Sequence, residues 1–117
     1  MIRRETDCGT ITMDSNVFRN IAGLAASNCF GVKGMAARSR KDGLIYLLRK
    51  ESANKGVSVT FNEDDSVTID LHIMVDHGVN IPVVSSSIIN EVAYNVTKTT
   101  GTAVKDIHVH VDSIMID

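Results

Sequence analysis

The sequence predicts an α+β fold of two layers, in which a small sheet, mixed or antiparallel, has two main helices and one short helix packed on one face. Two observations support this prediction. Several segments alternate apolar and polar residues, as strands do when they bury one face, and two longer segments repeat apolar residues at helical spacing. The predicted order is strand, helix, short helix, strand, strand, helix, strand. The 117 residues suit one domain spanning 1–117, with its core between about residues 9 and 116.

The first predicted strand covers residues 9–13, and the first main helix follows it. Asp14 or Ser15 begins this helix, and Gly31 ends it. The helix carries one apolar stripe at helical spacing: Val17, Ile21, Leu24 and Ala25.

A basic segment with several glycines, residues 30–43, comes next and is predicted as a loop or a weak strand. Leu44, Leu47 and Leu48 then form an apolar stripe, which predicts a short helix ending near Glu51 with its leucines toward the core.

The second half of the chain predicts a hairpin followed by the second main helix. Strands at 57–61 and 67–75 alternate apolar with polar residues and flank an acidic turn. Pro82 fits the first turn of the helix, because its missing N–H would have no partner there, and Gly101 fits its end.

The last predicted strand, residues 105–116, is long and rich in β-branched residues. Its apolar parity switches between Val111 and Ile114, which predicts a bulge or bend near Asp112. Both faces of the strand then carry apolar residues, and a sheet covered on one side leaves an edge or a face available. We therefore predict self-association into a homo-oligomer; the alternative is that N-terminal residues cover Ile114 and Ile116.

The net charge of −2 conceals a basic segment. Between residues 33 and 55 there are seven basic residues against two acidic ones, so this segment carries +5 and the rest of the chain −7. Six cations form a candidate partner-binding surface: Lys33, Arg38, Arg40, Lys41, Arg49 and Lys50. With the neighbouring leucines facing the core, attraction to lipid alone would be weak. The segment therefore predicts an acidic partner, either a membrane-anchored protein or the acidic face of a neighbouring copy.

The joint Asp76-His77-Gly78 connects the long strand to the second main helix. Each residue there has a structural role: Asp76 leaves the sheet, Gly78 permits the turn, and Asn80 or a neighbour caps the helix. General acid–base catalysis would also need a positioning group and a pocket, which the sequence does not indicate. We interpret the joint as a corner of the fold.

His72, His108 and His110 lie on the polar side of their strands. On neighbouring strands they would converge toward a metal such as zinc, but no cysteine or closely spaced carboxylate completes the set. The chain also lacks the recognisable hydrolase, metalloprotease and phosphate-loop motifs. The sequence therefore predicts no metal, no cofactor and no enzymatic activity.

The composition indicates a cytoplasmic protein. No run of about 18 apolar residues could span a bilayer, and the N-terminus has no apolar signal core. Cys8 and Cys29 stand apart from any metal-binding spacing, so we expect two reduced thiols.

A second function class remains open. Gly31-Val32-Lys33-Gly34 is a GxxG between two predicted helices, at the start of the basic segment. This order is similar to that of a KH domain, in which such a loop clamps an RNA backbone. The alternative prediction is therefore a KH-like RNA-binding module that uses the Gly31–Gly34 loop and the adjacent cations.

Two long blocks resemble the alkaline shock protein family, the envelope stress response proteins of Gram-positive bacteria. The first is "GTITMDSNVFRNIAGLAASNCFGVKGM", and the second is "KGVSVTF" followed by "VTIDLHIMVDHGVNIPVVSSSIINEVAYNVTKTTGTAVKDIHVHVDSI". His77 stands where many members have tyrosine. The resemblance implies a non-enzymatic cytoplasmic protein that self-associates, is recruited to the membrane by a separate anchored partner, and acts in envelope stress.

Overall fold

The computed structural model describes residues 1–116 and contains seven strands, two α-helices and one short 3-10 helix within them. The elements in chain order are β1 (Ile2–Thr6), β2 (Gly9–Met13), α1 (Ser15–Ser27), β3 (Val32–Arg38), β4 (Ile45–Leu47), η1 (Lys50–Gly56), β5 (Val57–Phe61), β6 (Val67–Asp76), α2 (Ile81–Thr100) and β7 (Val104–Met115).

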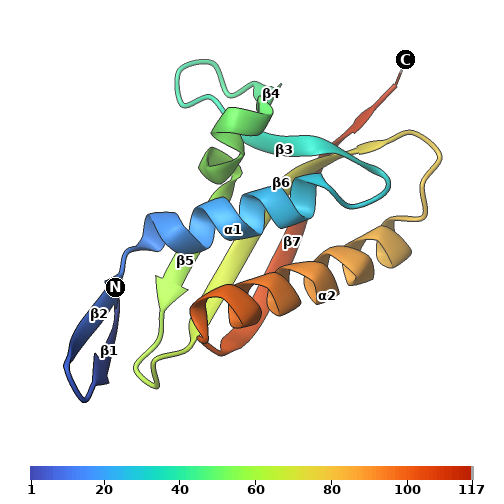
Figure 1. Cartoon of the computed structure of the whole chain (residues 1–117). Coiled ribbons are helices and arrows are strands. Elements are labelled where there is room, and N and C mark those ends of the chain that lie inside the picture. Colours follow the sequence, from blue (N-terminus) through green and yellow to red (C-terminus); the bar gives the residue numbers. More distant parts are fainter. Residues whose placement is uncertain (117) are drawn as a thin grey trace.

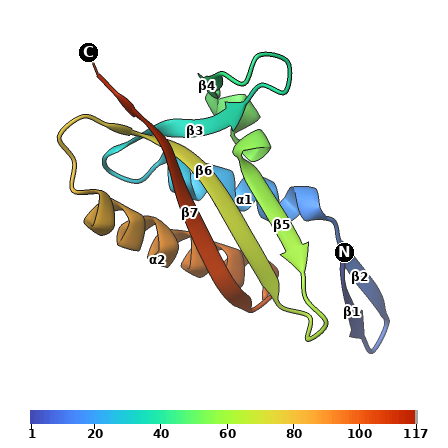
Figure 2. The ribbon, with the colours of Figure 1, turned by 180° about the vertical axis from the view of Figure 1, so that it is seen from behind.

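The main sheet is built around β6, and the two α-helices cover one of its faces (Figure 1). One edge of β6 pairs antiparallel with β5 along its first half and with β3 along its second half. The other edge pairs in parallel with β7 (Figure 2). The predicted two-layer α+β architecture is confirmed, and the sheet is mixed.

The core lies between this sheet and the two α-helices. The alternate residues of β6 point into it and are buried: Val67, Ile69, Leu71, Ile73 and Val75. They meet apolar side chains from α1 and α2: Phe18, Ala22, Ala26, Val84, Ile88, Val92 and Val96. Phe18 also meets Phe61 of β5 edge to face, with ring centroids 5.7 Å apart.

The basic segment forms strand structure where a loop or weak strand was predicted. Gly34, Met35 and Ala36 are all buried, because β3 is paired at its edges and also packs against η1. A strand buried on both faces shows no alternation, so periodicity could not identify it.

The prediction of a short helix over the leucines is wrong. Ile45–Leu47 forms β4, which pairs antiparallel with β3, and the short helix η1 begins later, at Lys50. The hairpin turn is closed by the Ser39 N–H, which donates to the Leu44 C=O at 2.8 Å, and Gly43 takes a positive φ of 71°. β-Branched and aromatic residues favour a strand here.

The N-terminal residues form a strand that the sequence did not indicate. β1 pairs antiparallel with β2 as a separate two-stranded ribbon. Ile2 is buried in the core, which therefore begins before residue 9, whereas Ile11 of β2 is half exposed.

The predicted bulge, the start of α1 and both boundaries of α2 are confirmed, but α1 ends at Ser27 with Asn28 as its C-cap, so the prediction that Gly31 ends it is wrong. The β6–β7 register shifts where Val111 and Ser113 pair with successive residues of β6, which leaves Asp112 as the extra residue. At the start of α2, the Asn80 side chain accepts a hydrogen bond from the Val83 N–H at 3.2 Å. Gly101 ends the helix in the left-handed region.

Candidate interaction surfaces

The β3–β4 hairpin and η1 stand together at one end of the molecule and are called here the basic lobe, residues 32–56 (Figure 1). All six predicted cations lie in it, and all are exposed. Arg38, Arg40 and Lys41 cluster at the end of β3 and in the hairpin turn, and are called the basic tip. The structure therefore brings half of the predicted surface together at the turn.

The other three cations lie toward the opposite end of the hairpin. Lys33 is at the start of β3, five residues and roughly 17 Å of strand from Arg38. Arg49 and Lys50 follow Leu48, whose N–H donates to the Met35 C=O at 2.8 Å, so they come after β4 near the first residues of β3. The six cations are thus two groups on one lobe.

Apolar side chains accompany the basic tip. Leu44, Tyr46 and Leu47 are 57%, 48% and 39% exposed, respectively. The prediction that Leu44 and Leu47 face the core is wrong, because β4 pairs only with β3 among the described strands. Leu48 does pack against the core. The outward surface of the lobe is therefore both cationic and apolar.

Hydrogen bonds order the hairpin turn. Arg38 Nη1 donates to the Gly43 carbonyl at 2.8 Å. Asp42 accepts from the Leu44 N–H at 3.0 Å and from the Tyr46 hydroxyl at 2.8 Å. These bonds lower the pKa of Asp42, the Leu44 N–H most, so its carboxylate stays charged. Three tip cations and one carboxylate leave a local charge of +2.

The edge of β7 is a second candidate surface. Among the described strands, only β6 pairs with β7, so its outer edge is open along twelve residues (Figure 2). Ile114 and Ile116 are 45% and 73% exposed. The alternative that N-terminal residues cover them is wrong, because β1 and β2 lie at the opposite end of the molecule.

Two histidine–aspartate pairs join β6 to β7 on the face without helices. His72 Nδ1 is 3.1 Å from Asp112 Oδ2, and His110 Nε2 is 3.2 Å from Asp70 Oδ1. The two imidazole rings stack with centroids 4.6 Å apart. His108 lies opposite Asp70 in the strand register. The sequence showed the polar parity of these residues, but only the parallel pairing of β6 and β7 brings the carboxylates to the rings.

Over residues 1–116, no group of three or more His, Cys, Asp or Glu side chains is arranged to hold a metal ion.

At the predicted corner, Asp76 and His77 use their backbone N–H groups in bonds to the carbonyls of Gly31 and Met115. Gly78 has a φ of 89°, as the turn requires.

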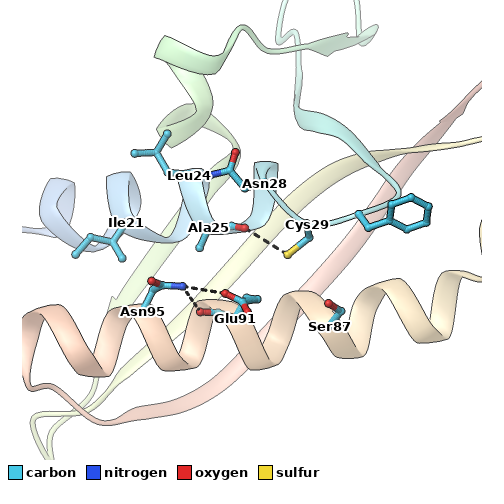
Figure 3. A pocket seen from close by; sticks show the side chains of 9 residues that line it. Ile21, Leu24, Ala25, Asn28, Cys29, Ser87, Glu91 and Asn95 are labelled. Atoms are coloured by element: carbon cyan, nitrogen blue, oxygen red, sulfur yellow. Dashed lines mark hydrogen bonds between the residues drawn. The ribbon is translucent and has the colours of Figure 1, made fainter.

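A groove of about 670 Å³ runs between α1 and α2 on the outer side of the helical layer (Figure 3). Its lining mixes apolar and polar side chains: Ile21, Leu24, Ala25, Asn28, Cys29, Phe30, Ser87, Glu91 and Asn95. Cys29 Sγ donates to the Ala25 carbonyl at 3.3 Å. Burial, and then the Glu91 carboxylate, raise the pKa of the Cys29 thiol against an opposing hydrogen bond from Ser87.

Cys29 should therefore be a slow thiol. Both cysteines are free, and Cys8 is exposed. The thiolate is the reactive form, so the raised pKa lowers the reactive fraction of Cys29, and partial burial limits access to it. We expect Cys29 to react more slowly than the exposed Cys8. Maleimide labelling followed by mass spectrometry measures both rates. Glu91→Gln should accelerate Cys29 alone, and equal rates for the two thiols would contradict this environment.

The GxxG segment does not form a KH-type loop. Gly31 lies in the turn after α1, and Val32–Gly34 belong to β3, which leads into a hairpin. A KH loop connects two helices, so the KH-like prediction is wrong in its geometry.

No helix within residues 1–116 has both the length and the apolar composition needed to cross a membrane.

Comparison with known proteins identifies relatives along almost the whole chain. Residues 3–116 match the model of the alkaline shock protein 23 family, described as having a cell envelope-related function. The uncharacterized protein YloU of Bacillus subtilis (strain 168) is 35% identical over 116 residues, which cover 98% of this chain and 96% of YloU. Spy1614 of Streptococcus pyogenes serotype M6, also uncharacterized, is 33% identical and covers 98% of this chain and 95% of its own length. YqhY, another uncharacterized B. subtilis protein, is 31% identical over 117 residues, which cover 100% of this chain and 85% of YqhY. No solved structure gives a significant match.

Proposed function

Since the chain belongs to the alkaline shock protein 23 family, whose function is related to the cell envelope, we propose that it is a non-enzymatic scaffold on the cytoplasmic side of the envelope. It binds copies of itself through the edge of β7 and an anionic partner at the membrane through the basic lobe. It needs no cofactor. The observation that carries the proposal is the long open edge of β7 with its exposed isoleucines.

The edge of β7 suits pairing with a second copy. An open strand presents a row of unpaired N–H and C=O groups, which another strand satisfies by extending the sheet. Two β7 strands that pair antiparallel are related by a twofold axis, so each copy offers the same groups. In β7, every second residue from Ile107 to Val111 is apolar and points to the helix side. If the β7 strands of two copies pair so that these residues stay on the same face, apolar side chains of one copy lie opposite apolar side chains of the other.

The charge distribution suits an anionic partner at one end of the molecule. The basic lobe lies at one end, and the acidic turn between β5 and β6, with Glu63, Asp64 and Asp65, lies at the other (Figures 1 and 2). A negatively charged surface repels the acidic turn and attracts the basic lobe, so it disfavours the orientation in which the acidic turn faces it. The lobe would therefore face the envelope. For its partner, the sequence analysis left open a membrane-anchored protein or the acidic face of a neighbouring copy.

Replacing the exposed isoleucines tests the self-association. The variant Ile114→Lys/Ile116→Lys should weaken the dissociation constant for copies of the chain by at least about tenfold, because it removes apolar contact area and brings like charges together. Sedimentation velocity over a range of concentrations measures this. Both side chains are exposed, so the melting temperature should hardly change.

A matched variant places the same charges elsewhere. Val83→Lys/Ile89→Lys changes two exposed apolar residues of α2 and should assemble like the unmodified chain. If both double variants assembled equally well, the edge of β7 would not be the self-association surface.

A further inference from the structure

We propose that the basic lobe binds an anionic lipid bilayer directly, with the side chains of Leu44, Tyr46 and Leu47 entering the headgroup region beside the cations of the basic tip. This inference rests on the proposed role of the lobe as the surface for an anionic partner, and it assigns that partner to lipid. The protein would then lie on the membrane as a peripheral protein.

The apolar residues are the first argument. Single exposed apolar side chains are common, but here three occur within four successive residues of one hairpin. Within β4, strand alternation places Tyr46 and Leu47 on opposite faces of the hairpin, and Leu44 directly precedes this strand. The hairpin therefore carries apolar groups on both faces, which fits insertion of its end into a soft apolar layer better than docking of one face against a rigid surface.

The cations are the second argument. Arg38, Arg40 and Lys41 lie next to these apolar residues, and Arg49 and Lys50 add two more charges on the same lobe. Near an anionic membrane surface, each basic residue strengthens binding roughly fivefold. Charge attraction alone gives weak, reversible binding, and so does a small apolar contact alone. Their combination on one lobe is the pairing of signals that peripheral membrane binding requires.

The remaining charges favour one orientation of the bound protein. The acidic turn, Glu63–Asp65, is at the end of the molecule far from the basic lobe (Figure 1). With the lobe on the membrane, this turn points away from the anionic headgroups.

Other anionic partners explain less of the lobe. Single-stranded RNA would use aromatic side chains for stacking, and the one aromatic residue here, Tyr46, has its hydroxyl bonded to Asp42. A phosphate backbone offers no apolar surface against which the exposed leucines could be buried. An acidic protein would need an apolar pocket for each face of the hairpin, whereas lipid chains adapt to both.

Vesicle sedimentation tests the inference. The purified chain should pellet with vesicles made of equal parts phosphatidylglycerol and phosphatidylcholine, and should stay in solution with phosphatidylcholine alone. Arg40→Glu/Lys41→Glu should weaken binding about twentyfold or more, from roughly fivefold per cation. Leu44→Ser/Leu47→Ser should weaken it about tenfold, because two partly buried leucines leave the apolar layer. Circular dichroism melting checks that each variant folds, and Leu44→Ser alone serves if the double variant does not.

The matched control is Arg3→Glu/Lys98→Glu, which makes the same change in net charge at exposed positions outside the lobe. It should bind vesicles nearly as the unmodified chain does. The inference is overturned if the unmodified chain ignores anionic vesicles, since the partner would then be an anionic protein or nucleic acid. It is also overturned if the leucine variant binds the vesicles equally well, since the attraction would then come from charge alone, without apolar insertion. Sedimentation without vesicles reports self-association separately, so assembly without vesicle binding removes only the lipid assignment.

Discussion

Reversing Arg38, Arg40 and Lys41 to Glu is expected to release the protein from the membrane fraction of its native cell. The basic tip, counted with Asp42, changes from +2 to −4. Losing three cations at about 1 kcal/mol each weakens attachment to an anionic partner by at least about a hundredfold, before any repulsion. Quantitative immunoblotting of pelleted membranes measures the fraction that remains bound.

The same triple reversal should leave the fold almost unchanged. All three side chains are exposed, and the one hydrogen bond lost is that from Arg38 Nη1 to the Gly43 carbonyl. Surface substitutions of this kind usually change stability by about 0.5 kcal/mol or less. If the triple variant stayed with the membranes as the unmodified chain does, at low and at high salt, the basic tip would be only a solvated surface.

Gly56→Ala is expected to lower the stability of the fold far more than the triple reversal of the basic tip. Gly56 ends η1 where the chain passes against β3 and β6. An added Cβ would lie 2.9 Å from the Ala36 carbonyl oxygen, 3.0 Å from Met35 Cβ and 3.2 Å from the His72 carbonyl oxygen. These atoms belong to two strands of the sheet, so little can move away. Overpacking of this kind costs about 2–3 kcal/mol, which lowers the melting temperature by roughly 10 °C in a domain of this size.

Gly9→Ala is the matched control for this substitution. A Cβ at Gly9 meets no atom within 4 Å, so its melting temperature should stay close to that of the unmodified chain. Thermal unfolding followed by circular dichroism compares the two. Equal melting temperatures would mean that η1 can move away from the sheet, and that the orientation of the basic lobe is not fixed by this contact.

The elements that sequence reasoning located correctly bury one face and leave the other polar. β5, β6 and β7 alternate in this way, and α2 has a proline in its first turn and a glycine at its end. β3 shows no alternation because both of its faces are covered, so the sequence predicts only a loop or a weak strand there. β1 gives no periodic signal because Ile2 is its only buried residue. Periodicity reports one-sided burial and nothing else.

The candidate surfaces were predictable in charge but not in shape. The sequence identified all six cations of the basic lobe, yet the leucines beside them were read at helical spacing. The segment instead forms a three-residue strand, and Leu44 and Leu47 are exposed on the hairpin. Exposed leucines beside the cations favour a lipid partner over a purely charged one. The histidine–aspartate pairs were equally hidden, because the contacts of Asp70 and Asp112 span 40 residues and depend on the parallel pairing of β6 with β7.

The most direct test of the scaffold proposal is the molar mass of the purified, unmodified chain, measured by light scattering as its concentration increases. A chain that pairs through the open edge of β7 should exceed its monomer mass of 12.7 kDa, and the excess should increase with concentration. A mass that stays at 12.7 kDa up to the highest soluble concentration, with the C-terminal isoleucines intact, would contradict the proposal.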